Sequence, residues 1–263
     1  MHTQISTARF HLQKMGSYLF NIGLLAGLAT LTFGLVSCGG GGGTSTTAIA
    51  NTTMTVTGIS PLGIVASSVE QTVYILGTNF ASGVSVSITN SSGVSITNSS
   101  GTPAVNSLVI APSGNAITAK IKIDTAPTNR YVTLKVQPST GTSVSAILGV
   151  ASVSKTFAAD ISSILSTPAS AVSCTGCHSG TTPTGGLDLT NANNLINQPS
   201  QGCSQKFRVV PGDPRRSSSV LIDKIEATSA VPACSGASMP NGSTSLIPAE
   251  IQDIVEWVAG GAN

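Results

Sequence analysis

The sequence is poor in charged and aromatic side chains. Only 8% of its 263 residues are charged and 4% are aromatic, and there is a single tryptophan. Two of the 12 basic residues, Arg9 and Lys14, lie in the first 37 positions, so the rest of the chain carries ten basic and ten acidic residues. A near-neutral chain without a basic stripe lacks the electrostatic footprint of a nucleic-acid-binding protein, and no nucleic-acid partner is expected.

Histidine is scarce as well. His2 and His11 lie close to the first residue, and His178 is the only histidine in the remainder of the chain. Small and β-branched residues dominate instead, with 28 glycines. This composition favours β structure and surface loops over a helical bundle, and the length is sufficient for two ordinary domains.

The first 37 residues have the pattern of an export signal. Arg9, His11 and Lys14 give a basic start, and an uncharged apolar run follows from residue 22 to 36. Such a run is too short to span a membrane comfortably, which distinguishes a cleaved signal from a membrane anchor.

The apolar run ends in Leu35-Val36-Ser37-Cys38, which resembles the lipobox of bacterial lipoproteins. The resemblance implies cleavage before Cys38 and lipidation of this cysteine, which would anchor the protein in the bacterial cell envelope. By the same resemblance, Gly39 in the following position indicates the outer membrane. The alternative is an ordinary cleaved signal followed by a chance cysteine. Residues 38–52, which include five consecutive glycines, are predicted to form a flexible tether.

Residues 53–153 show short alternating segments separated by turn residues, the pattern of an all-β sandwich. The expected strands cover residues 54–57, 72–76, 84–89, 117–123, 131–136 and 144–148. The stretches Gly58-Ile59-Ser60-Pro61 and Val73 to Phe80 resemble the IPT/TIG immunoglobulin-like domain, over residues 53–151. That resemblance implies an immunoglobulin-like fold acting as a spacer or binding module.

An eight-residue repeat interrupts this region. Residues 86–93, Val-Ser-Ile-Thr-Asn-Ser-Ser-Gly, are repeated without change as residues 94–101. We interpret the second copy as a tolerated insertion that lengthens a hairpin or adds an edge strand.

The clearest chemical signal is Cys174-Thr175-Gly176-Cys177-His178. A C-x-x-C-H sequence predicts covalent haem attachment: two thioethers from the cysteines, and the histidine as an iron ligand. A redox dithiol is one alternative, but it calls for a βαβ pattern that the sequence lacks. Another is a zinc site in which Cys203 or Cys234 completes a Cys₃His ligand set.

Helical spacing appears in residues 155–263. Apolar residues at 157, 161, 164 and 165 predict a helix that ends before Pro168, residues 217–225 predict a second, and Pro248 begins a final helix that stops at Gly260. A helix before the haem motif and another at the end resembles the class I cytochromes c. That resemblance implies an all-α haem domain in which the two helices cross, with Phe157 and Trp257 as candidates for the contact.

The second axial ligand is predicted to be Met239. With the leader removed, His178 is the only histidine and Met54 and Met239 the only methionines, and Met54 lies in the sandwich region. In class I cytochromes c the distal methionine comes from a loop, often before a proline, as in Met239-Pro240. The alternative is a packing methionine, with the iron five-coordinate or bound by lysine.

Two further predictions concern the surroundings of the haem. Cys203 and Cys234 are expected to form a disulfide in an oxidising compartment, closing a loop of about 30 residues, with free structural thiols as the alternative. Arg208, Arg215 and Arg216 are candidates to pair with the haem propionates.

The sequence therefore predicts a multidomain protein, an all-β sandwich followed by an all-α cytochrome c domain. The expected function is one-electron transfer by a membrane-anchored carrier of a single covalent haem c. Redox partner proteins, either other cytochromes or a terminal reductase or oxidase, would exchange the electron. Two alternatives stay open: an adhesion or structural lipoprotein with an accessory haem, and a haem enzyme such as a small peroxidase, which requires a vacant or labile iron position.

Overall fold

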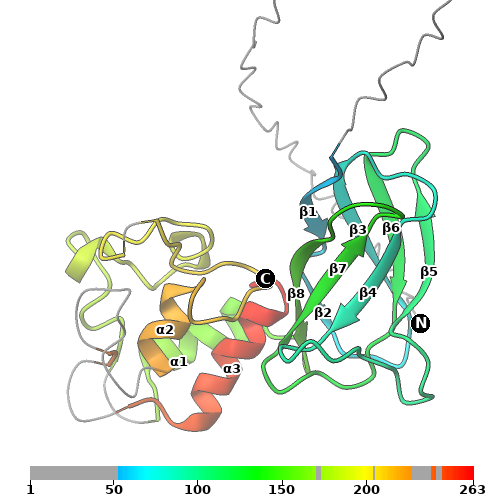
Figure 1. The fold of residues 1–263 in the computed structure, drawn as a ribbon. Coiled ribbons are helices and arrows are strands. Elements are labelled where there is room, and N and C mark those ends of the chain that lie inside the picture. The colour runs from blue at the N-terminus through cyan, green and yellow to red at the C-terminus, as the bar shows by residue number, and fades with distance from the viewer. Residues whose placement is uncertain (1–52, 170–172, 204, 227–237, 241–244) are drawn as a thin grey trace, which may run out of the picture. The chain divides into compact units, whose positions relative to one another are not determined.

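The computed structural model describes residues 53–169, 173–203, 205–226, 238–240 and 245–263. All of them belong to one compact unit, Ala50–Asn263, which is distinct from Met1–Ile49 (Figure 1). The predicted signal peptide, the lipidated Cys38 and the tether to residue 52 lie outside the described residues. Within the described ranges, no helix is long and apolar enough to cross a membrane.

The first part of the unit is a β-sandwich of two four-stranded sheets. In sheet order, one contains β1 (Thr55–Ser60), β3 (Gln71–Thr78), β6 (Ala116–Ile121) and β5 (Val105–Ile110), and the other β2 (Gly63–Val65), β8 (Val144–Ala151), β7 (Tyr131–Gln137) and β4 (Ser85–Thr89). Paired strands are antiparallel except β2 and β8. These orders match the A-B-E-D and C-F-G sheets of the immunoglobulin fold, with β2 as an added edge strand. The fold is therefore an immunoglobulin-like sandwich.

Alternation of side chains explains why these segments form strands. In β3, Val73 and Ile75 are fully buried between the sheets, whereas Tyr74 and Leu76 point outward and are exposed. Buried positions of seven strands meet in one apolar core, and partly buried residues of β5 pack against it. Because residues two apart share a face of a strand, the period of two in the sequence builds this core directly.

The two copies of the repeat form a ribbon that leads from β4 towards β5. Each copy makes the same turn, in which the side-chain oxygen of its asparagine, Asn90 or Asn98, accepts hydrogen bonds from the backbone N–H groups two and four residues further on. Single β-bridges link the first copy to the second, and the second to Pro103. The second copy was predicted to lengthen a hairpin or add an edge strand; in the structure it instead adds a second tight turn after the first.

The part from residue 155 onward contains few helices. A short π-helical segment, Phe157–Ile161, runs into α1 (Ser162–Ser166), and two more helices follow, α2 (Val220–Glu226) and α3 (Pro248–Ala259). Apart from two 3₁₀ turns, the other described residues of this part form turns, bends and isolated bridges. The expected all-α domain is therefore not what the described residues show, because the glycine- and proline-containing stretch between α1 and α2 folds into turns.

A second apolar core holds these helices together. The Phe157 and Trp257 rings lie 5.7 Å apart, centroid to centroid, and the Trp257 indole N–H donates to the Asn263 carbonyl oxygen at 2.9 Å. The predicted contact between the first and last helical segments is confirmed. At the start of α3, the Glu250 carboxylate accepts hydrogen bonds from the backbone N–H groups of Ile247 and Ala169, which ties the helix to the end of α1.

Candidate functional site

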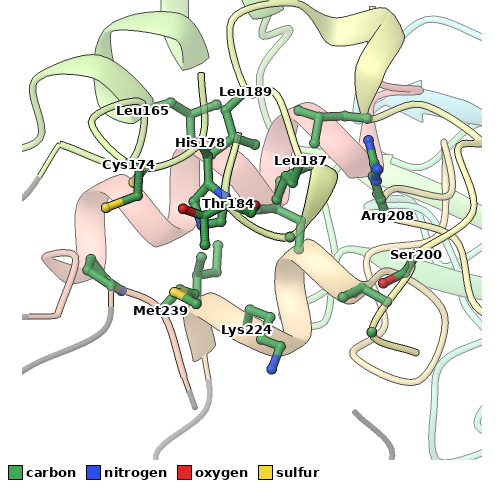
Figure 2. A pocket seen from close by; sticks show the side chains of 18 of the residues that line it. Leu165, Cys174, His178, Thr184, Leu187, Leu189, Ser200, Arg208, Lys224 and Met239 are labelled. Atoms are coloured by element: carbon green, nitrogen blue, oxygen red, sulfur yellow. Dashed lines mark hydrogen bonds between the residues drawn. The ribbon is translucent and has the colours of Figure 1, made fainter. Parts of the chain in front are cut away.

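A cavity of about 330 Å³ lies beside the C-x-x-C-H segment (Figure 2). All four residues predicted to hold the cofactor line it: Cys174, Cys177, His178 and Met239. The motif and Met239 are far apart in sequence, so it is the fold that brings them to one site. Met54, the other methionine considered, is buried in the core of the sandwich.

Backbone hydrogen bonds attach the motif to the end of α1. The Leu165 carbonyl oxygen accepts hydrogen bonds from the backbone N–H of Cys174, at 2.9 Å, and of Thr175, at 3.1 Å. Within the motif, the His178 backbone N–H donates to the Cys174 carbonyl oxygen at 3.0 Å. The five residues thus form one tight turn, with Cys174 half-buried and Cys177 exposed.

A hydrogen bond fixes the histidine ring. The Nδ1 atom of His178 lies 3.0 Å from the Thr184 carbonyl oxygen. Since a carbonyl oxygen can only accept, Nδ1 carries the proton, and the lone pair of Nε2 remains free to bind a metal. Figure 2 shows Thr184 beside the His178 ring.

Met239 lies at a different wall of the cavity from the motif, beside α2. Its backbone N–H donates to the carbonyl oxygen of Lys224, in α2, at 2.9 Å. In Figure 2 its side chain is drawn below that of His178, with Cys174 to one side. A thioether and an imidazole therefore border the same cavity from separate segments of the chain.

The walls of the cavity are mostly apolar. They come from the end of α1, from the turns after the motif, from α2 and from the segment before α3, and their leucine, valine and isoleucine members are Leu165, Leu187, Leu189, Leu195, Val220, Leu221, Ile225 and Leu246. Sequence analysis anticipated the helical positions among them but not the leucines in the turns, which have no period to reveal them.

Two basic residues, Arg208 and Lys224, are the only charged residues among the described lining of the cavity. Arg208 is held in place because its guanidinium donates to the Asn194 and Gly186 carbonyl oxygens, at 2.6 and 3.0 Å. No sequence signal pointed to Lys224.

The other two candidate arginines are used elsewhere. Arg215 makes a two-pronged ion pair with Asp213, and Arg216 lies 3.4 Å from Asp223. Neither belongs to the described lining of the cavity. Of the three arginines considered from the sequence, only Arg208 reaches the site.

The cysteines fall into two groups. Cys174 and Cys177 are free thiols, and burial raises the pKa of Cys174, which keeps it neutral. Cys203 is buried, lines the cavity and is disulfide-bonded. Its predicted partner, Cys234, lies outside the described residues. A sulfur in a disulfide is not a thiolate ligand, so Cys203 does not complete a zinc site with the motif.

No protein-family model matches the chain, and no curated protein matches it. Solved structures do. The first immunoglobulin domain of the mouse polymeric immunoglobulin receptor is 18% identical, with a TM-score of 0.25, over 37% of this chain and 96% of that one. The tandem immunoglobulin repeats of Dlar are 15% identical, with a TM-score of 0.22, over 33% of this chain and 41% of that one. The chain thus spans less than half the length of the Dlar structure.

Proposed function

We propose that this protein is a c-type cytochrome that carries one electron at a time. One haem c would be attached through Cys174 and Cys177, with His178 and Met239 as axial ligands. The observation that supports this most strongly is that all four residues, from separate segments, border one apolar cavity. When bound, the haem supplies a one-electron iron couple, and a thioether ligand favours its ferrous state.

The residues of the cavity fit such a group. Apolar walls suit the faces of a porphyrin and exclude water from it. Arg208 and Lys224 provide positive charge for its two carboxylates, and no acidic residue of the described lining opposes them. The Thr184 carbonyl oxygen holds the His178 ring with its second nitrogen free for the metal.

The arrangement favours a carrier over an enzyme. His178 and Met239 would both hold the iron, and a site in which the chain supplies both of these ligands is suited to electron transfer rather than to binding a substrate. Cys177 is exposed, so this part of the site would be accessible to a redox partner protein, either another cytochrome or a terminal reductase or oxidase. The export pattern and the lipobox resemblance at Cys38 support a lipid-anchored location in the bacterial cell envelope, at the outer membrane.

The proposal is tested by producing the chain together with haem-attachment machinery. We expect a mass increase of one haem, a low-spin c-type spectrum, and pigment that stays with the protein in acidified organic solvent. A Cys174→Ser, Cys177→Ser double variant is the matched control and should lose the covalent pigment. Wild-type protein that is colourless, or that releases its pigment into the solvent, would contradict the proposal.

A further inference from the structure

The sandwich and the last helix meet backbone against backbone. A Cβ atom placed on Gly63, in β2, would lie 2.0 Å from the Ala259 carbonyl oxygen at the end of α3. A Cβ atom on Gly149, in β8, would lie 2.2 Å from the same oxygen. Contacts this short leave no room for any side chain, so two neighbouring strands and a helix end touch directly.

A loop beside α2 closes the same junction. The Gly212 backbone N–H donates to the Val258 carbonyl oxygen of α3 at 2.8 Å. A Cβ atom on Gly212 would lie 2.0 Å from the Leu62 carbonyl oxygen, on the sandwich side. Residues 211–214 are all buried. The loop therefore contacts the helix and the sandwich at once.

A buried carboxylate links the two parts as well. Glu256, in α3, is 2% exposed. It accepts hydrogen bonds from the Ser152 backbone N–H, at 2.6 Å, and from the side chain of Arg130, which precedes β7. A buried charge is tolerated only when it is paired and hydrogen-bonded, and here the sandwich provides the cationic partner.

We propose that the sandwich is a rigid mount for the C-terminal part, and that the described residues of the two parts fold and move as one body. In this arrangement the sandwich is more than a spacer. It packs against the last turn of α3 and so fixes the orientation of the cavity relative to the sandwich. None of the proposed cofactor residues takes part in these contacts, so the rigid mount does not depend on the proposed haem.

The single tryptophan gives a direct test, because Trp257 reports on the C-terminal part alone. In the purified full chain, we expect urea unfolding followed by Trp257 emission to coincide with the loss of strand signal in far-UV circular dichroism. Ile75→Val, which trims the sandwich core, should lower the midpoint seen by both probes equally. An unchanged Trp257 midpoint in this variant, or two separate transitions in the wild type, would overturn the proposal.

A second pair of variants tests the junction itself. Gly149→Ala should lower the Trp257 midpoint, because its Cβ has no room beside Ala259 and Gly212. Gly58→Ala is the matched control: it also lies in a sandwich strand, but its Cβ would meet nothing within 4 Å, so it should not lower the midpoint. If Gly149→Ala leaves the midpoint at the wild-type value, the junction does not form as described. If this variant does not fold, Ile75→Val decides the question.

Discussion

The rings of Phe157 and Trp257 lie 5.7 Å apart and are tilted by 54°. The two residues stand at opposite ends of the C-terminal part, and both are buried. The separation of the two ring centroids lies within the range that aromatic pairs prefer. It joins the segment that leads to the C-x-x-C-H turn with the helix that packs against the sandwich.

Removing the Phe157 ring should destabilise the protein. Phe157→Ala is expected to reduce the free energy of unfolding by about 3–5 kcal/mol, because it removes a large buried side chain and leaves a cavity. Phe157→Leu should cost about 1.5 kcal/mol or less, since it keeps most of the volume. Urea unfolding followed by Trp257 emission measures both. Equal losses of stability in the two variants would contradict this expectation, because the volume kept by leucine would then contribute nothing.

Met239→Ala tests the proposed role of Met239 as an iron ligand. In the ferrous protein with haem bound, we expect this variant to bind carbon monoxide readily, while the untreated wild type does not. Met54→Ala, at a buried position in the sandwich, is the control and should leave the visible spectrum unchanged. Carbon monoxide binding by the wild type at the rate of Met239→Ala would favour a haem enzyme with a labile iron position.

Glu256 should make stability depend on pH. Burial raises the pKa of Glu256, but hydrogen bonds from Ser152 and Arg130 to its carboxylate outweigh burial and lower the pKa below the usual glutamate value. A carboxylate with a lowered pKa contributes stability that is present above its unfolded pKa of about 4.3 and is lost as the pH falls through the folded pKa.

Glu256→Gln should therefore be less stable than the wild type at neutral pH and come closer to it in acid. Urea midpoints measured across this range check the expectation. Asp253→Asn, on the same helix but 39% exposed and paired with Lys155 at 3.1 Å, should change the pH profile less than Glu256→Gln does. A constant difference between Glu256→Gln and the wild type at every pH would rule out the titration of Glu256 as the cause.

The repeat offers a comparison of one substitution in two identical sequences. Val86 is 8% exposed, whereas Val94, its counterpart in the second copy, is 61% exposed. Val86→Ala should cost about 2 kcal/mol and Val94→Ala less than about 0.5 kcal/mol. Thermal unfolding of the two variants checks this. Similar losses would mean that the second copy takes the place of the first in the sandwich.

The sequence predicted most of the sandwich because its strands alternate. It missed β2 and β5 for physical reasons. The three residues of β2 are too few to show a period. In β5 no residue is fully buried, since this strand lies at the edge of its sheet, so its pattern is weak.

The candidate site was predictable where its residues are adjacent in the sequence, as they are from Cys174 to His178. Met239 was identified by elimination and by resemblance to class I cytochromes c. Lys224 and the leucines of the turns could not be found in this way, because tertiary packing alone brings them to the cavity. The expected all-α domain is not shown by the described residues, whose helices are few, because helical spacing at three places does not determine how the intervening residues fold.

The length of the repeat has a consequence of its own. Eight is an even number, so inserting a whole copy leaves the alternation of inward and outward side chains unchanged on either side. Related chains that gain or lose copies would differ in the reach of this ribbon while every strand kept its face. A gain or loss of an odd number of residues would have exchanged the inward-facing and outward-facing side chains on one side of the insertion.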